Sequence, residues 1–237
     1  MLRIRAVTLD AYGTVFDFES ALPRIAGEVL AAQGRAGFPA GTLADSWGAN
    51  FYALYEQFGG SRPEAGGEFR TIARLTADAL ELTSRQHGLG LDPWPGTEIW
   101  LRHLRAVRPF PEVPGVLAAL DGRFLLAMLS DTDDGIIAPA LERLGGRFRF
   151  VLTSEQVRAY KQDPRGTLFR RALAELGLPA EAVVHVGDST ADIRGAKAAG
   201  MRMAWVNRFG RELAAGCPRP DWEIPDLTAL PELLDGD

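Results

Sequence analysis

The stretch "IRAVTLDAYGTVFDFES", residues 4–20, opens with an apolar run that ends on one acidic residue, Asp10. Gly13 and Thr14 follow closely and are typical of a tight turn. The pattern predicts a buried strand with an isolated carboxylate at its carboxyl end. Tyr12 stands between the acid and the turn, so the strand tip presents one carboxylate and one weakly acidic phenol.

Further short apolar runs share the character of the first. The predicted strands are "AVTLD" (6–10), "FLLAMLS" (124–130), "FVLTS" (150–154), "AVVHVGD" (182–188) and "RMAWVN" (202–207). They are apolar on both faces, which suits a parallel sheet covered by helices on both sides. Helical patterns lie between them, for example residues 163–178, where Gly177 predicts a helix end. This alternation predicts an α/β fold with a doubly wound parallel sheet.

The region from 17 to 108 departs from this alternation and reads as all helical. Two segments rich in Gly and Pro, "GGSRPEAGGE" (59–68) and "GLDPWPG" (90–96), separate its helical patterns. We therefore expect residues 1–16 and 109–237 to form a core domain and residues 17–108 to form an inserted helical domain.

The composition excludes several classes of protein. A net charge of −5 gives no electrostatic reason to expect nucleic acid or an anionic membrane as partner. The single cysteine, Cys217, excludes an intrachain disulfide and a thiolate metal cluster. No apolar run approaches the roughly 18 residues of a membrane span, and no signal peptide is recognisable. We expect a cytoplasmic protein that acts on a small molecule. The oligomeric state is left open, a homodimer included.

Residues with chemical potential follow the predicted strands. The first strand ends in Asp10, the second in Ser130 and the fourth in Asp188, and Asp192 stands four positions further on. Lys161 follows the third strand. Functional groups of open α/β sheets collect at the carboxyl ends of the strands. We therefore expect these side chains to converge on one edge.

In this order, "DAYGT" (10–14), Ser130, Lys161 before "DPR" and "GDSTAD" (187–192) resemble the four motifs of the haloacid dehalogenase (HAD) superfamily. The resemblance covers essentially the whole chain. It is specific because all four motifs occur in order around a helical insert. It implies a Rossmann-like core, a helical cap inserted after the first motif, and a hydrolase with an aspartate nucleophile.

The resemblance also implies roles for single residues. Asp10 would attack an electrophilic centre and form a covalent aspartyl intermediate, which water then hydrolyses. Thr14 would hydrogen-bond the substrate or the nucleophile, Ser130 would donate to a bound oxyanion, and Lys161 would stabilise developing negative charge. The residues expected to contact the substrate are Tyr12, Gly13, Asp131 and Trp47.

In the phosphatase branch of the superfamily, acids at these positions hold Mg²⁺, a hard ion that favours oxygen ligands. The implied ligands here are Asp10, Asp188, Asp192 and the backbone carbonyl of Tyr12. Residues 189–192 also fit a helix-capping pattern, which gives Asp192 an alternative role. His185 lies inside an apolar strand and is expected to be a core residue.

Tyr12 separates the enzymatic alternatives. Phosphatases of this superfamily resemble D-x-D-G-T, where the second Asp protonates the leaving alkoxide, and a phenol with a pKa of about 10 is a poor substitute. The 2-haloacid dehalogenases share the D-x-Y-G-T pattern found here, since a halide needs no proton. Taken alone, Tyr12 favours a dehalogenase.

Other features favour the phosphatase. Dehalogenases work without metal and have softened the fourth motif towards Ser and Asn, whereas "GDSTAD" keeps both acids. The dehalogenase arginine that binds the substrate carboxylate follows a cap tryptophan, but Gly48 follows Trp47 here. Asp131 stands where the family usually has Asn, which adds negative charge. The arginines that could substitute are Arg35, Arg62, Arg70 and Arg74.

On balance we expect a Mg²⁺-dependent phosphatase that acts on a small phosphorylated metabolite through Asp10. The first alternative is a metal-independent 2-haloacid dehalogenase, or a related carbon–halogen or strained-ring hydrolase. The second is a catalytically weakened binding protein that keeps the fold and the metal site.

Overall fold

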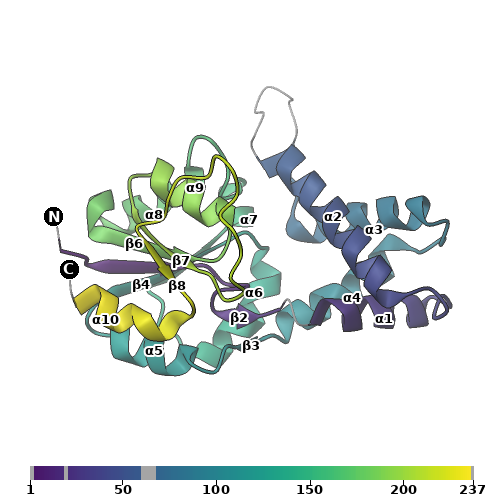
Figure 1. Ribbon diagram of the computed structural model, residues 1–237, viewed down its shortest axis with the longest axis horizontal. Helices are drawn as coiled ribbons and strands as arrows, with labels where there is room; N and C mark the ends of the chain where they lie inside the picture. The colour runs from purple at the N-terminus through teal and green to yellow at the C-terminus, as the bar shows by residue number, and fades with distance from the viewer. Residues whose placement is uncertain (1–2, 19–20, 60–67, 236–237) are drawn as a thin grey trace.

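The computed structural model describes residues 3–18, 21–59 and 68–235. Its core strands are β1 (Ala6–Leu9), β4 (Leu125–Ser130), β5 (Phe150–Thr153), β6 (Val183–Gly187), β7 (Arg202–Val206) and β8 (Trp222–Ile224). They form one parallel sheet in the order β5-β4-β1-β6-β7-β8 (Figure 1). The sequence predicts all of these strands except the edge strand β8.

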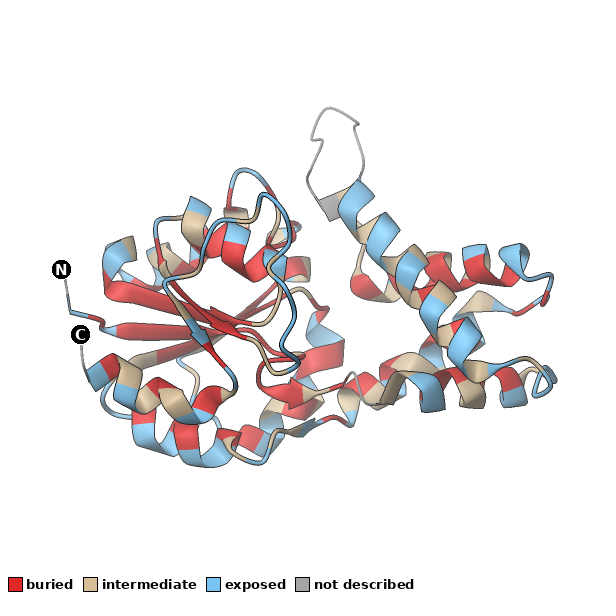
Figure 2. Cartoon of the chain, viewed as in Figure 1, coloured by how far each residue is buried: buried red, intermediate tan, exposed pale blue. Residues whose placement is uncertain are grey.

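Helices cover both faces of this sheet, which confirms the expected doubly wound fold (Figure 1). Because the strands are buried from both sides, their apolar runs show no alternation (Figure 2). One face carries α8 (Thr167–Leu176) and α9 (Thr190–Ala198), and the other carries α5 (Val113–Leu120) and α10 (Leu230–Asp235). The remaining core helices are α6 (Asp134–Leu141), α7 (Ser154–Val157) and the 3-10 turns η3 (Glu142–Leu144), η4 (Ala180–Ala182) and η5 (Leu227–Ala229).

Two short strands, β2 (Phe16–Asp17) and β3 (Arg108–Pro109), form an antiparallel pair. In the chain, four helices follow β2 and precede β3. These helices are α1 (Leu22–Ala32), α2 (Ala40–Gly59), α3 (Ile72–Gln86) and α4 (Pro93–Arg105). They stand beside the core as a separate bundle, which we call the cap (Figure 1). The expected domain boundaries fall within β2 and β3.

Local sequence signals account for the end of α8 and the start of α9. Gly177 adopts a left-handed conformation with a φ of 63° and ends α8, as predicted. Ser189 and Asp192 form a reciprocal capping box at the start of α9. Most of the segment 59–68, including Arg62, lies outside the described residues. None of the helices in the described ranges is both long and apolar enough to cross a membrane.

Candidate active site

The strand order brings the expected catalytic residues to one edge of the sheet. β1 lies between β4 and β6, so Asp10 after β1 has Ser130 at the end of β4 on one side and Asp188 after β6 on the other. Lys161 comes from the loop between α7 and α8. Parallel strands thus deliver these groups from distant parts of the sequence to one place.

Lys161 lies between two carboxylates. Its Nζ atom donates to Asp10 Oδ1 and is 2.6 Å from Asp192 Oδ1, and all three side chains are buried. Burial disfavours the charged amine, but Asp10 and Asp192 outweigh it and hold the pKa of Lys161 above its ordinary value. The ammonium therefore supplies the positive charge that two buried carboxylates so close together need in order to stay ionised.

Burial also governs the nucleophile candidate. It raises the pKa of Asp10 to about 7, since the attraction of Lys161 offsets the cost only in part and the charge of Asp192 adds to it. Asp192 shifts the other way: burial opposes its charge, but Lys161 and His185 hold its pKa below the ordinary range. Of the two acids that share Lys161, Asp10 is thus the one that titrates near neutral pH.

The carboxylate of Asp192 is fully occupied by protein donors. Its Oδ1 lies 2.8 Å from His185 Nε2 as well as contacting Lys161, and its Oδ2 accepts from the backbone and the hydroxyl of Ser189. A carboxylate has about four acceptor positions, and these contacts fill them. His185, buried as expected, also lies 2.9 Å from the Thr8 hydroxyl through Nδ1. Burial lowers the pKa of His185, so its neutral form orients Asp192.

Asp188 completes an acidic cluster. One carboxylate oxygen from each of Asp10, Asp188 and Asp192 lies within 4.8 Å of the others. Such donors suit a hard divalent cation, so Asp10 and Asp188 fit the expected Mg²⁺ ligand set. Asp192 fits it less well, because an ion would have to displace Lys161, His185 or Ser189 from its oxygens.

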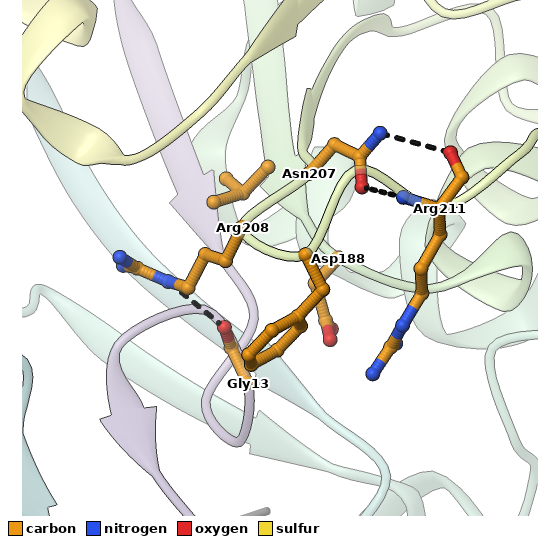
Figure 3. A pocket seen from close by; sticks show the side chains of 7 residues that line it. Gly13, Asp188, Asn207, Arg208 and Arg211 are labelled. Carbon is orange, nitrogen blue, oxygen red and sulfur yellow. Dashed lines mark hydrogen bonds between the residues drawn. The ribbon is translucent and has the colours of Figure 1, made fainter.

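The turn after Asp10 is held from outside. Gly13 has a φ of 90°, and a Cβ atom there would collide with the carboxylate of Asp188. Arg208 donates to the carbonyls of Gly13 (3.3 Å) and Thr14 (2.9 Å), and it contacts Glu112 at 2.6 Å. Figure 3 shows Arg208 reaching the Gly13 carbonyl at the small pocket that Asp188 and Arg211 also line. The Thr14 hydroxyl is buried and makes no hydrogen bond within the described ranges.

Tyr12 contributes an aromatic ring next to the nucleophile. The ring lies 6.1 Å from Phe16 and 6.3 Å from Phe18, measured between centroids. Burial raises the pKa of the Tyr12 phenol above its ordinary value, and Asp10 adds to the shift. The phenol is therefore a weaker acid than an ordinary tyrosine and stays protonated at physiological pH, so it is a poor substitute for the second Asp of a D-x-D-G-T motif.

Asp131 is bound by both the core and the cap. Its Oδ1 and Oδ2 lie 3.0 and 3.2 Å from the backbone nitrogen of Lys161, and its Oδ2 accepts from the hydroxyl of Tyr55 on α2. Burial raises the pKa of Asp131 to about 6, although Lys161 and Tyr55 oppose the shift. Tyr55 was not among the residues expected at the site, since no sequence pattern links it to Asp131.

Trp47, expected to contact the substrate, is packed inside the cap. Its indole is buried and donates to the carbonyl of Thr76 on α3 at 3.0 Å. This contact between α2 and α3 accounts for the tryptophan without a substrate. Gly48, the next residue, has open space around it: no atom lies within 4 Å of a Cβ atom built there.

The doubly wound core and its inserted cap place a buried carboxylate beside an ammonium at the strand ends, an arrangement that could support nucleophilic attack by Asp10. A family model for haloacid dehalogenase-like hydrolases matches residues 4–200. The chain belongs to this family of hydrolases, as the order of its motifs predicts.

Several relatives that match along nearly the full length of the chain are dehalogenases. The (S)-2-haloacid dehalogenase of Pseudomonas sp. strain YL is 31% identical over 98% of this chain and 95% of its own length. A crystal structure of an L-2-haloacid dehalogenase matches with a TM-score of 0.82 and 26% identity, over 99% of this chain and 100% of that one. The phosphoserine phosphatase of Thermus thermophilus is 38% identical over 55% of this chain and 53% of its own length. These findings fit the dehalogenase alternative better than the phosphatase expectation.

Proposed function

We propose that the protein hydrolyses a carbon–halogen bond with Asp10 as nucleophile and without a metal. The carboxylate attacks the halogen-bearing carbon, a C–O bond forms, and the halide leaves with the electrons of the broken bond. Water then attacks the carbonyl carbon of the aspartyl ester. The alcohol product leaves, the carboxylate is regenerated, and one proton passes to solvent.

The observation that carries this proposal is Tyr12, whose buried phenol stands two residues after Asp10, where the phosphatases of the superfamily have their acid–base aspartate. A phenol is a weak proton donor for an alkoxide, and burial raises its pKa further, whereas a halide leaves without a proton. Lys161 supports the same reaction because its ammonium contacts both Asp10 and Asp192 and offsets part of their negative charge. Similarity along the whole chain to 2-haloacid dehalogenases adds further support.

Halide release tests the proposal directly. The purified protein, with EDTA present, is incubated with 2-chloropropionate and with 2-chloropropionamide, and chloride is measured. We expect release from at least one of them, accompanied by an ester on Asp10 detected by intact mass in a rapid quench. Asp10→Asn should abolish both signals. Chloride release that Asp10→Asn leaves unchanged would refute the assignment of the nucleophile.

A phosphatase is the second candidate, and the cluster of Asp10, Asp188 and Asp192 favours it. Asp10, Asp188 and the carbonyl of Tyr12 would hold Mg²⁺, which would polarise phosphoryl oxygens. Hydrolysis of p-nitrophenyl phosphate with Mg²⁺, and its loss with EDTA, tests this candidate. A gain of that activity in Tyr12→Asp would indicate a site otherwise suited to phosphate.

Silence in both assays would favour the binding-protein alternative. In that case isothermal titration with Mg²⁺ would show whether the acidic cluster binds the ion alone. The cytoplasmic location, the small-molecule partner and a homodimer remain predictions from the sequence.

A further inference from the structure

Aromatic rings connect the two ends of the site through the cap. Neighbouring centroids lie 6.3 Å apart from Tyr12 to Phe18, 5.3 Å from Phe18 to Trp100, 6.3 Å from Trp100 to Phe51 and 6.3 Å from Phe51 to Tyr55. Tyr55 lies 5.0 Å from Tyr160, the residue before Lys161. We call this series, from Tyr12 to Tyr160, the aromatic arch. It begins two residues after the nucleophile and ends one residue before its ammonium partner.

The arch offers a substrate apolar surface and neutral hydroxyls rather than charge. Phe51, Tyr55 and Trp100 are each partly exposed, so they keep surface for contact with a bound molecule. Ring faces and edges of this kind bind apolar and aromatic groups. A molecule that reaches Asp10 from beneath the cap would therefore be enclosed on one side by uncharged groups.

The described arginines on the cap helices, and Arg35 and Arg70 between them, bind other groups of the protein. Arg35 donates to the carbonyl of Leu89 at 2.6 Å, and Arg70 and Arg74 both pair with Asp78. The other arginines within the four cap helices also have carboxylate partners: Arg24 and Arg102 with Glu28, Arg85 with Glu81, and Arg105 with Glu98. The arginine substitutes considered from the sequence, as far as they are described, thus already bind other groups of the cap, and a substrate carboxylate would have to compete with those partners.

A substrate carboxylate needs a positively charged partner, but Asp131 supplies a negative charge beside Ser130. Asp131 follows Ser130 directly, and its own oxygens are occupied by Tyr55 and the backbone of Lys161. The ammonium of Lys161 is shared by Asp10 and Asp192. A second anion brought beside the half-buried Asp131 would meet like charge, which opposes binding.

We propose that the substrate of this hydrolase is an uncharged organohalide, such as a haloamide, and not a haloacid. The inference rests on the proposed dehalogenase function and narrows its substrate class. The arch receives the uncharged body of the molecule, Asp10 faces its halogen-bearing carbon, and Asp131 excludes a carboxylate.

Paired substrates that differ in charge alone test the inference. The value of kcat/KM for chloride release is measured for 2-chloropropionamide and 2-chloropropionate, and for chloroacetamide and chloroacetate. Each value is divided by the uncatalysed rate of the same compound. We expect the amide to be preferred by at least about tenfold in both pairs. A smaller preference, or a preference for the acids, overturns the inference and leaves the proposed function standing. Chloride release from none of them refutes the proposed function itself.

Two variants test the residues that carry the argument. Asp131→Asn removes the negative charge, and Gly48→Arg adds a guanidinium to the face of α2 that carries Phe51 and Tyr55. Each should move the amide-to-acid ratio towards the acid by about tenfold, and the double variant further. Asp134→Asn, the same chemical change on α6, is the matched control and should leave the ratio unchanged. Unaltered ratios in folded Asp131→Asn and Gly48→Arg would overturn the inference.

Discussion

Asp10 competes with Asp192 for one ammonium group, and the outcome sets its protonation state. With a pKa of about 7, Asp10 is protonated and not nucleophilic in acid, and ionised in mild alkali. We expect kcat/KM to fall as the pH drops below about 7 and to level off above it. Halide release measured across pH checks this with a substrate whose charge is constant. A flat profile from about pH 5 to 9 would contradict it.

Arg208 fixes the turn that carries the nucleophile. Its guanidinium binds the carbonyls of Gly13 and Thr14, pairs with Glu112 and lies 3.6 Å from the centroid of the Phe110 ring. Arg208→Met should lower kcat by about tenfold to a hundredfold with a smaller effect on KM, because the turn loses its outer support.

A lysine cannot reproduce this fork of donors, so Arg208→Lys should recover only part of the rate. Arg171→Met is the control, since Arg171 is exposed and pairs within its own helix with Glu175. An Arg208→Met enzyme with unchanged kcat would show that the turn holds its shape unaided.

The sequence predicts some of these residues and not others for a physical reason. Asp10 and Ser130 end apolar runs, so their position at strand tips follows from where these runs end. Tyr55 and Arg208 do not end an apolar run, and no other sequence pattern identifies them as site residues. Their contacts depend on how the cap and the end of β7 pack against the core, which no local pattern of residues encodes.

Helix α9 packs closely against the catalytic loop. A Cβ atom on Gly195 would lie 2.6 Å from the carbonyl of Lys161 and would also overlap the ring of Phe169. Gly195→Ala should therefore lower the free energy of unfolding by about 1–3 kcal/mol, and it should displace Lys161.

Gly48→Ala is the matched control in α2, where nothing lies within 4 Å of the added atom. This substitution should raise the free energy of unfolding by up to about 1 kcal/mol through helix propensity. Urea denaturation of both variants measures the contrast. Equal midpoints would mean that α9 can shift away from the loop at little cost.

Helix α3 of the cap is capped by a residue of the core. The carboxylate of Asp133 accepts from the backbone nitrogens of Ile72 at 2.8 Å and Ala73 at 2.9 Å. Asp133→Ala should lower the free energy of unfolding by about 1 kcal/mol, the usual loss when a helix cap is removed. Faster hydrogen exchange at the start of α3 would report it, and Asp133→Asn, which keeps one acceptor oxygen, should show a smaller effect. Unchanged exchange in Asp133→Ala would mean that water replaces the carboxylate without cost.

Elements of two or three residues lay beyond prediction from the sequence. β2 and β3 have two residues each and β8 has three, too few to show either an apolar run or an alternation. Their pairing is decided by long-range packing. The longer strands and all four cap helices were predictable because each buries a continuous stripe or run of apolar side chains.

Across the whole molecule, the cap is tied to the core near the site as well as at β2 and β3. Tyr55 donates to Asp131, Gln162 donates to the carbonyl of Tyr55 at 3.0 Å, and Tyr160 donates to the carbonyl of Arg70. These contacts lie at the side of the cap that faces the loop of Lys161. They hold the cap against the core and shield the carboxylates from water, which strengthens the electrostatic interactions among them.

Closure of the cap should therefore depend in part on the hydroxyl group of Tyr55. Tyr55→Phe removes the donor to Asp131 and keeps the ring in the aromatic arch. A hydrogen bond to a charged group contributes about 1.5–3 kcal/mol, so the open form should gain about tenfold or more in population. We expect KM to rise and hydrogen exchange to quicken in α2 and residues 159–162. The melting temperature should move by less than about 4 °C, because neither domain loses its own core.

Tyr160→Phe should act in the same direction through the separate contact to Arg70. A Tyr55→Phe enzyme with the original KM and exchange pattern would mean that other contacts, such as β2, β3 and Asp133, are enough to keep the cap closed.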